Sequence, residues 1–271
     1  MSPPHTTVTA TMTDPLRVAW LTTGRGPGSY GALEYTLNAI EPGLPVRIAV
    51  LFVNREPGEA EPTDRLLALA REHQIPVETI SSVRFRKARG GKLSKPGEPL
   101  PAWRLEYDEA VAARLAKYDF RLGVLFGYML IATPALFERF VLINDHPALP
   151  DGPVGTYQEV IAELMRTSAA ESGCLMNLVT GDLDRGPVLS FCRFGLKDEA
   201  SAAAWASWPK AAANGVPIEE SALYAEIRRR GVERERPFLV ETLRAVAEGR
   251  LRVPGGPAID LTAAVERAVA E

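Results

Sequence analysis

The chain has 271 residues, with 31 Lys and Arg against 34 Asp and Glu, and a formal net charge of −3. A charge so close to neutral creates no global field that attracts nucleic acid or an anionic membrane. No apolar run reaches the roughly 18 residues that a membrane helix needs, and two cysteines are too few for a disulfide framework or a closed zinc site. We therefore expect a cytoplasmic protein without a metal, and neither nucleic acid nor a membrane as partner.

The first part of the sequence alternates apolar runs with helical patterns. Residues 1–16 are rich in Thr and Pro and are expected to form a flexible tail. Apolar runs predict strands at 17–23, 46–53 and 75–80, and apolar spacing predicts helices at 33–40 and 65–74. Strands that alternate with helices in this way are typical of a parallel sheet with helical crossovers.

Residues 84–103 interrupt this alternation with six basic side chains and several Gly and Pro residues. We interpret this segment as a basic loop inserted into the domain. It is either a solvated insertion or an arm that meets an anionic substrate or partner.

The remaining patterns complete a single α/β domain. They predict strands at 120–126, 140–144, 174–179 and 188–194, and helices at 107–118, 134–140, 157–168, 200–208, 222–230 and 237–248. The fold class that follows is α/β, a Rossmann-like and mostly parallel sheet. We expect the domain to cover residues 17–195 and a helical C-terminal extension, 196–271, to pack on it.

The most informative stretch is 143–150, where a buried strand ends. Asn144 and His146 are two residues apart, so their side chains face the same side of the strand. Sites in open α/β sheets form at such strand ends, and two adjacent donors suit an oxygen that becomes negative during acyl transfer. The alternative is a strand-end turn with a hydrogen-bonded histidine. Asp145 should point to the other side of the strand, where burial predicts a partner such as an arginine.

A second stretch follows the predicted strand at 174–179. Here a tight loop carries two acids, Asp182 and Asp184, before the chain leaves as another strand. A carboxylate in this loop could orient His146 and raise the pKa of its imidazole, because a nearby negative charge favours the charged ring. The alternative is a loop whose acids only form turns.

Together the two stretches resemble one family. Asn-x-His-Pro at 144–147, followed about 40 residues on by Leu-Asp-x-Gly-Pro at 183–187, resembles the catalytic pattern of the folate-dependent formyltransferases, with the purine-biosynthesis branch as the nearest likeness. Further matches support the resemblance in the same order along the chain: Gly26-Pro27-Gly28-Ser29, Arg104-Leu105-Glu106-Tyr107-Asp108 and Gly127-Tyr128-Met129-Leu130-Ile131.

The resemblance implies a formyltransferase fold and transfer of a formyl group from 10-formyltetrahydrofolate to a small, possibly phosphorylated amine. Asn144 and protonated His146 would bind the oxyanion, and Asp184 would keep His146 charged and help to move the proton. The implied folate-binding residues are Met129, Leu130, Ile131, Thr180, Gly181, Asp182 and Leu183. The implied amine-substrate residues are Gly26, Gly28, Ser29, Tyr30 and Arg104. The sequence leaves the oligomeric state open between a monomer and a homodimer.

The sequence departs from the family pattern on the amine side. Pro27 removes a backbone donor from the Gly-rich loop, Tyr30 stands where the family usually has Asn, and Asp145 stands where an apolar residue is expected. We therefore expect a formyltransferase with a different amine. The alternatives are a 10-formyltetrahydrofolate hydrolase and a non-catalytic folate-binding relative. The hydrolases usually carry a regulatory domain ahead of this fold, and the 15 residues here before Leu16 favour transfer.

Overall fold

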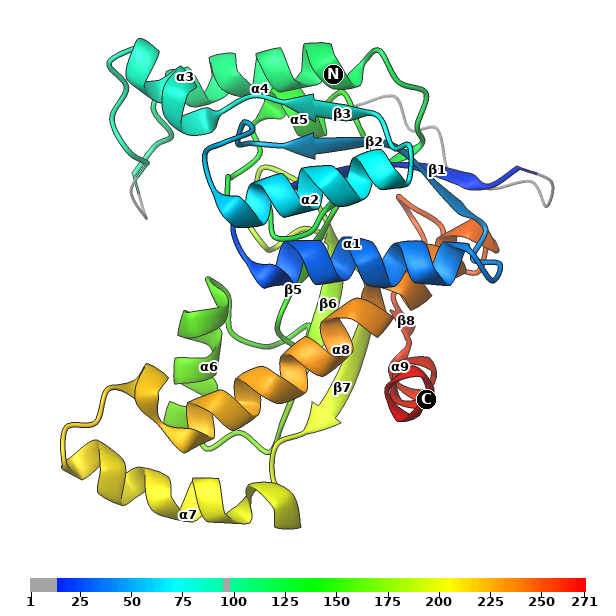
Figure 1. The fold of residues 1–271 in the computed structure, drawn as a ribbon. Coiled ribbons are helices and arrows are strands. Elements are labelled where there is room, and N and C mark those ends of the chain that lie inside the picture. Colours follow the sequence, from blue (N-terminus) through cyan, green and yellow to red (C-terminus); the bar gives the residue numbers. More distant parts are fainter. Residues whose placement is uncertain (1–13, 95–97) are drawn as a thin grey trace.

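The computed structural model describes residues 14–94 and 98–271. Its centre is a sheet with the strand order β3-β2-β1-β4-β5-β6-β7-β8 (Figure 1). The strands are β1 (Leu16–Thr22), β2 (Val46–Val53), β3 (Val77–Thr79), β4 (Leu122–Leu125), β5 (Leu142–His146), β6 (Glu171–Leu178), β7 (Val188–Gly195) and β8 (Ile259–Asp260). Only β6 runs antiparallel to its neighbours, so the prediction of a mostly parallel α/β sheet is confirmed.

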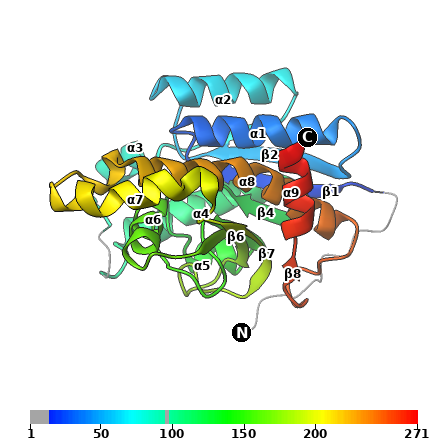
Figure 2. The same ribbon diagram turned by 90° about the horizontal axis from the view of Figure 1, so that it is seen from below.

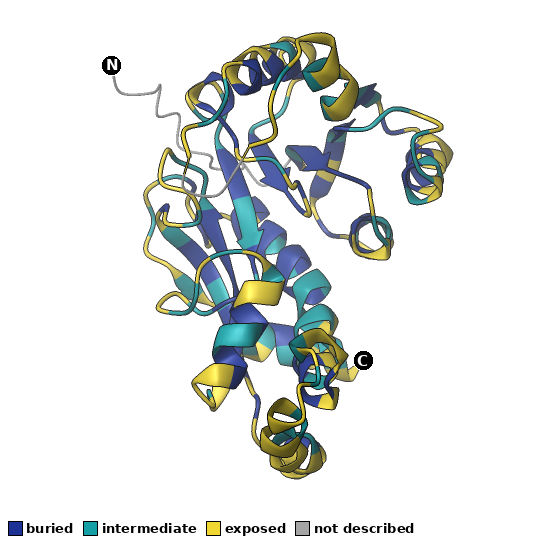
Figure 3. Ribbon diagram, turned by 90° about the vertical axis from the view of Figure 1, so that its left-hand side faces the viewer, coloured by how far each residue is buried: buried dark blue, intermediate teal, exposed yellow. Residues whose placement is uncertain are grey.

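Helices cover both faces of the sheet (Figure 2). They are α1 (Pro27–Ile40), α2 (Glu61–Glu72), α3 (Ser82–Ala88), α4 (Trp103–Leu115), α5 (Pro134–Phe137), α6 (Tyr157–Arg166), α7 (Glu199–Ala213), the 3-10 turn η1 (Ile218–Glu220), α8 (Ala222–Ala247) and α9 (Thr262–Ala270). One apolar core joins the sheet to α1, α2, α6 and α8, and a second joins it to α4 and α5. The strands are therefore buried, while the outer helix faces are exposed (Figure 3).

The segment predicted as a basic loop begins with regular structure. Helix α3 includes Arg84, and its first turn is capped by the Ser81 hydroxyl, which accepts the Arg84 N–H at 3.1 Å. Arg84 also forms an ion pair with Glu56 at 2.6 Å, and Arg89 forms one with Glu106. Two of the basic side chains thus have acidic partners within the chain, and both interpretations of the segment stay predictions. Residues 95–97 of this segment lie outside the described residues, as do residues 1–13 of the predicted tail.

The C-terminal part differs from the expected pair of helices. A single 26-residue helix, α8, replaces the predicted helices at 222–230 and 237–248, with Pro237 inside it. An interior proline costs about 3 kcal/mol of helix propensity. The complete burial of Phe238, Leu239 and Leu243 against the sheet offsets this cost. The extension also carries an unpredicted strand, β8, which pairs in parallel with β7.

Helix α8 contacts elements from both the N-terminal and the C-terminal parts of the domain. It packs on α1, α6, α7 and α9 and on strands β6 and β7. Its path across the sheet is visible as the long orange helix in Figure 1. Within the described ranges, no helix is both long enough and apolar enough to cross a membrane.

Candidate active site

The predicted pair Asn144 and His146 ends strand β5, on one face of the sheet. In the antiparallel register with β6, Asn144 lies opposite Asn177, and His146 lies opposite Leu175. The His146 ring is buried, and its Nε2 lies 3.0 Å from the carbonyl oxygen of Pro153. The period-two argument from the sequence therefore agrees with the positions of both side chains.

Asp184 joins this pair from the loop between β6 and β7. The loop folds back toward β5, and the Asn144 Nδ2 donates to the Asp184 Oδ1 at 3.2 Å. Burial raises the pKa of the Asp184 carboxyl above its ordinary value, and the nearby charge of His146 opposes this shift. The structure thus brings the three predicted residues together, although the hydrogen bond of Asp184 goes to Asn144 rather than to His146.

The position of Asp184 depends on the tight backbone around it. Asp184 itself has a left-handed φ of 54°. At Gly186 a Cβ atom would overlap the carbonyl oxygen of Leu178, so only glycine lets the loop lie against the end of β6. Near the start of the loop, the Thr180 hydroxyl accepts the Asp182 N–H at 3.2 Å.

Replacement of Gly186 by Ala is expected to move this loop and to lower turnover about 100-fold, because a shift of about 1 Å at a reacting group has an effect of that size. The Cβ would meet backbone, which cannot rotate away. Steady-state kinetics would measure the loss. The matched control is Gly195→Ala at the end of β7, whose Cβ would meet nothing within 4 Å. Equal activity of the two variants would contradict the assigned role of the loop.

The predicted folate-binding residues include three large apolar side chains that are exposed. Met129 is 65% exposed, Leu183 54% and Ile131 40%. Exposed apolar side chains rimmed by polar groups mark binding surfaces. The segment 129–131 is fixed by a hydrogen bond from the Met129 N–H to the Thr23 hydroxyl at 2.9 Å. Leu130 packs partly into the core, while Gly181 and Asp182 are exposed.

Arg104 was predicted to bind the amine substrate, but the structure buries it inside the domain. Its side chain is only 1% exposed and forms an ion pair with Asp108 at 3.2 Å. It also donates to the carbonyl oxygen of Ile131 at 2.6 Å. Burial raises the pKa of the Asp108 carboxyl, and the Arg104 charge opposes the shift. Arg104 therefore lies beneath the predicted folate segment, where its burial leaves no surface for a substrate.

The Gly-rich loop leads from β1 into α1. A Cβ at Gly26 or Gly28 would meet nothing within 4 Å, so the space beside the loop is open. Ser29 is buried and accepts a hydrogen bond from the Thr22 hydroxyl at 2.9 Å. Free backbone N–H groups in the first turn of a helix favour an anion, although Pro27 contributes none.

Tyr30 lies in the first turn of α1. The Arg65 guanidinium of α2 lies over its ring at 5.4 Å from the centroid. Burial and a hydrogen bond with Glu34 raise the pKa of the Tyr30 hydroxyl. Tyr30 thus packs beside Arg65 of α2, and its predicted role in substrate binding stays a prediction.

Two residues on neighbouring elements were not among the predicted site residues. Asn177 is buried opposite Asn144, and its Oδ1 has no hydrogen-bond partner among the described residues. Arg236 of α8 lies against Gly31 of α1, where a Cβ would collide with its guanidinium. Antiparallel pairing of the strands beside β5 could have identified Asn177, whereas Arg236 depends on the packing of α8 on α1.

Asp145 faces the opposite side of β5, as predicted, toward α8. The predicted arginine partner is not formed. The nearby Arg228 pairs with Glu235 at 2.7 Å instead, and the Asp145 Oδ1 is buried without a hydrogen bond among the described residues.

Comparison with known proteins finds a relative that is similar in sequence along most of this chain. A phosphoribosylglycinamide formyltransferase from Haemophilus influenzae is 25% identical over 242 residues, which cover 88% of this chain and 90% of that protein. No protein-family model matches the chain. The predicted resemblance to the formyltransferases is confirmed by this relative.

Solved structures show the same fold. The phosphoribosylglycinamide formyltransferase from Coxiella burnetii has a TM-score of 0.62 at 21% identity and covers 91% of this chain and 100% of its own. The glycinamide ribonucleotide transformylase 1 from Symbiobacterium toebii has a TM-score of 0.61 at 24% identity, with coverage of 90% and 92%. The predicted fold of the formyltransferase type is confirmed.

Proposed function

We propose that this chain, which has the fold of the phosphoribosylglycinamide formyltransferases and resembles one of them in sequence along most of its length, transfers a formyl group from 10-formyltetrahydrofolate to a primary amine. The observation that carries the proposal is the meeting of three side chains. Asn144 and His146 end β5 on one face, and Asp184 contacts Asn144 from a loop 40 residues further along the chain.

Each of these side chains has a role in the proposed reaction. The co-substrate supplies the formyl group, and the amine forms a new C–N bond to its carbon. Asn144 and protonated His146 donate to the carbonyl oxygen as it becomes negative, which lowers the barrier. Asp184 takes the proton that the amine loses and returns it to the departing folate nitrogen, directly or through water. A carboxyl pKa raised by burial suits an acid–base group near neutral pH.

The surroundings support the two proposed substrates. The exposed Met129, Ile131 and Leu183 offer an apolar surface for the pteridine ring, and the backbone of residues 180–183 offers donors and acceptors beside it. The open first turn of α1 suits an anionic group on the amine. A single domain that includes the C-terminal segment 196–271 is part of the proposal, because α8 covers the sheet beside β5 and β6.

Calorimetry with the stable 5-deaza analogue of the co-substrate, followed by a transfer assay, tests the proposal. We expect the analogue to bind and 10-formyltetrahydrofolate to be consumed only when an amine is present, with glycinamide ribotide as the first acceptor. Consumption without any amine would instead identify a hydrolase. If the analogue binds but 10-formyltetrahydrofolate is not consumed with any acceptor, the protein is a non-catalytic relative. If the analogue does not bind, the proposal is overturned.

A further inference from the structure

The basic stretch 84–94, most of which forms α3 and the turn after it, carries five cationic side chains and no acid. Two of the five, Arg84 and Arg89, form ion pairs within the chain. The cations that have no acidic partner among the described residues are Arg86, Lys87 and Lys92. Both lysines are exposed, so the stretch presents uncompensated positive charge to solvent.

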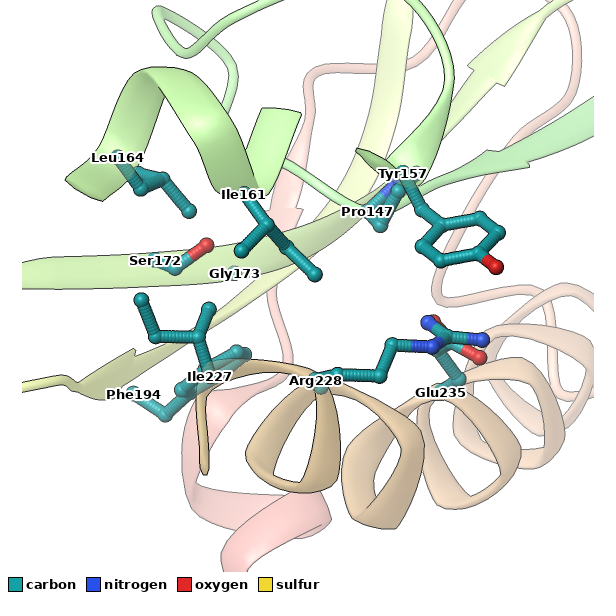
Figure 4. A pocket seen from close by; sticks show the side chains of 11 residues that line it. Pro147, Tyr157, Ile161, Leu164, Ser172, Gly173, Phe194, Ile227, Arg228 and Glu235 are labelled. Atoms are coloured by element: carbon teal, nitrogen blue, oxygen red, sulfur yellow. The ribbon is translucent and has the colours of Figure 1, made fainter. Parts of the chain in front are cut away.

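Helix α8 shows a dense basic run that is compensated. Arg228, Arg229 and Arg230 follow one another there, and each forms an ion pair with a glutamate. Figure 4 shows the first of these pairs, in which the Arg228 Nη1 lies 2.7 Å from the Glu235 Oε1. The run in α8 therefore needs no external anion, whereas the charge of the stretch 84–94 remains available to one.

A tight turn brings Lys87 and Lys92 to the same end of α3. The Gly90 N–H donates to the Lys87 carbonyl oxygen at 3.1 Å, and the Gly91 N–H donates to the Arg86 carbonyl oxygen at 3.0 Å. Gly90 has a left-handed φ of 59°, the conformation with which glycine closes a helix. The chain therefore reverses directly after α3, and Lys92 leaves the turn beside the last residues of the helix.

This turn is fixed against the first residues of α4. The Trp103 Nε1 donates to the Lys92 carbonyl oxygen at 2.8 Å. A Cβ at Gly91 would lie 2.6 Å from the Trp103 ring, so glycine lets the turn close on the indole. The next residue, Arg104, donates to the Ile131 carbonyl oxygen at 2.6 Å. Two adjacent residues of α4 therefore connect Lys92 to the proposed folate-binding segment.

The sheet topology also places the two segments at one edge. Strands β1 to β5 run parallel, so their carboxyl ends lie along the same edge of the sheet, where sites form. The basic stretch follows β3, and the folate-binding segment follows β4. Helices α3 and α4 contact each other beside this edge (Figure 1). The uncompensated charge therefore lies on the side of the molecule that carries the candidate active site.

We propose that Lys87 and Lys92 bind carboxylates of the glutamate tail of the folate co-substrate, so that the protein prefers forms with several linked glutamates. This inference rests on the proposed formyl transfer and names the form of its co-substrate. A folate carries its pteridine ring, its reacting nitrogen and its glutamate in that order. When the first two lie at the folate-binding segment and at Asn144, the anionic tail is the part left to reach the basic stretch.

The contacts favour the co-substrate over the amine acceptor as the occupant. The hydrogen bond from Arg104 to Ile131 ties the basic stretch to the folate-binding segment, while the open turn proposed for the anion of the amine begins α1. Each added glutamate also brings one more carboxylate. A tail that already bears one bound end presents these carboxylates to the lysines at a high effective concentration.

Calorimetry with the 5-deaza analogue in two forms, with one glutamate and with five, tests the proposal. Exposed ion pairs are weak singly, so we expect the five-glutamate form to bind at least about fivefold more tightly at low salt. A rise in ionic strength from about 0.01 M to about 1 M shortens the Debye length from about 30 Å to about 3 Å. The preference should therefore disappear at high salt.

Kinetics with 10-formyltetrahydrofolate in the same two forms provides a second readout. The tail is distant from the reacting carbon and is bound equally before and during the reaction. The five-glutamate form should therefore have a KM lower by the same factor and an unchanged kcat.

The variant Lys87→Gln/Lys92→Gln should reduce the preference to about twofold or less, because it removes both exposed cations. Its affinity for the one-glutamate form and its kcat should stay those of the wild type. The matched control is Arg47→Gln/Lys210→Gln, which removes the same charge at two other exposed positions, near the amino end of β2 and in α7. The control should keep the full preference.

Three outcomes overturn the assignment of the lysines: equal affinity for the two forms, a preference that persists in Lys87→Gln/Lys92→Gln, and a preference that the control loses equally. The last outcome would show an effect of net charge alone. Failure of the proposed function has a separate signature, because it requires only the one-glutamate form. If that form binds and donates its formyl group but the longer tail gives no gain, formyl transfer stands and the tail site falls. If neither form binds, both are overturned.

Discussion

Replacement of His146 or of Asp184 by Asn is expected to lower kcat for formyl transfer at least about 1000-fold while the protein stays folded. Removing one acid–base group or oxyanion donor typically costs about 100- to 10,000-fold. Each of the two side chains has that role in the proposed mechanism. Because the three side chains act as one unit, the double variant should lose little more than either single variant.

Circular dichroism and binding of the 5-deaza analogue would show that the variants fold and keep the folate site. His73→Asn, at the exposed C-terminus of α2, and Asp119→Asn are the matched controls and should keep full activity. Near-normal turnover in both His146→Asn and Asp184→Asn would exclude the assigned trio.

Arg104→Met is expected to destabilise the protein by about 3–5 kcal/mol, because removal of one partner leaves the other as an uncompensated buried charge. Asp108 is fully buried, and its Oδ2 also accepts the Thr133 N–H at 2.7 Å. The variant further loses the donor to the Ile131 carbonyl oxygen, so its affinity for the folate analogue should fall as well.

The loss should depend on pH in a defined direction. The pKa of Asp108 is already raised in the folded protein by burial, and removal of Arg104 raises it further. Stability is then lost as the pH rises through this folded pKa, so the deficit should be larger at pH 8 than at pH 5. Urea unfolding at both values measures it. Arg166→Met in α6, at an exposed pair with Glu163, should cost no more than about 1 kcal/mol. A deficit that is equal for both variants would refute the buried pair.

Most strands were predictable because each carries its own apolar run. The period of two also predicted that Asn144 and His146 face one side and Asp145 the other. The C-terminal helices were not predicted as one, because local propensity breaks a helix at Pro237, whereas burial of its neighbours sustains it. Strand β8 has two residues, too few for any periodic signal.

The candidate site was predictable where it follows a motif and not where it depends on distant contacts. Asp184 was identified by resemblance, but its contact with Asn144 requires a left-handed turn and a glycine two residues later. The four-residue spacing of Arg104 and Asp108 suits an ion pair on any exposed helix face. Its burial follows from a contact with Ile131, 27 residues further along the chain.

The long path of α8 has a consequence for synthesis of the protein. When the ribosome has made residues 1–221, strands β1–β7 and all three catalytic candidates exist, but the helix that covers β6 and β7 does not. The apolar face of β6 and β7 then lacks the cover of α8 until residues 222–247 emerge. Such exposed strands are prone to aggregation during folding. The nascent chain therefore passes through a vulnerable stage that ends only when residues 222–247 have been made.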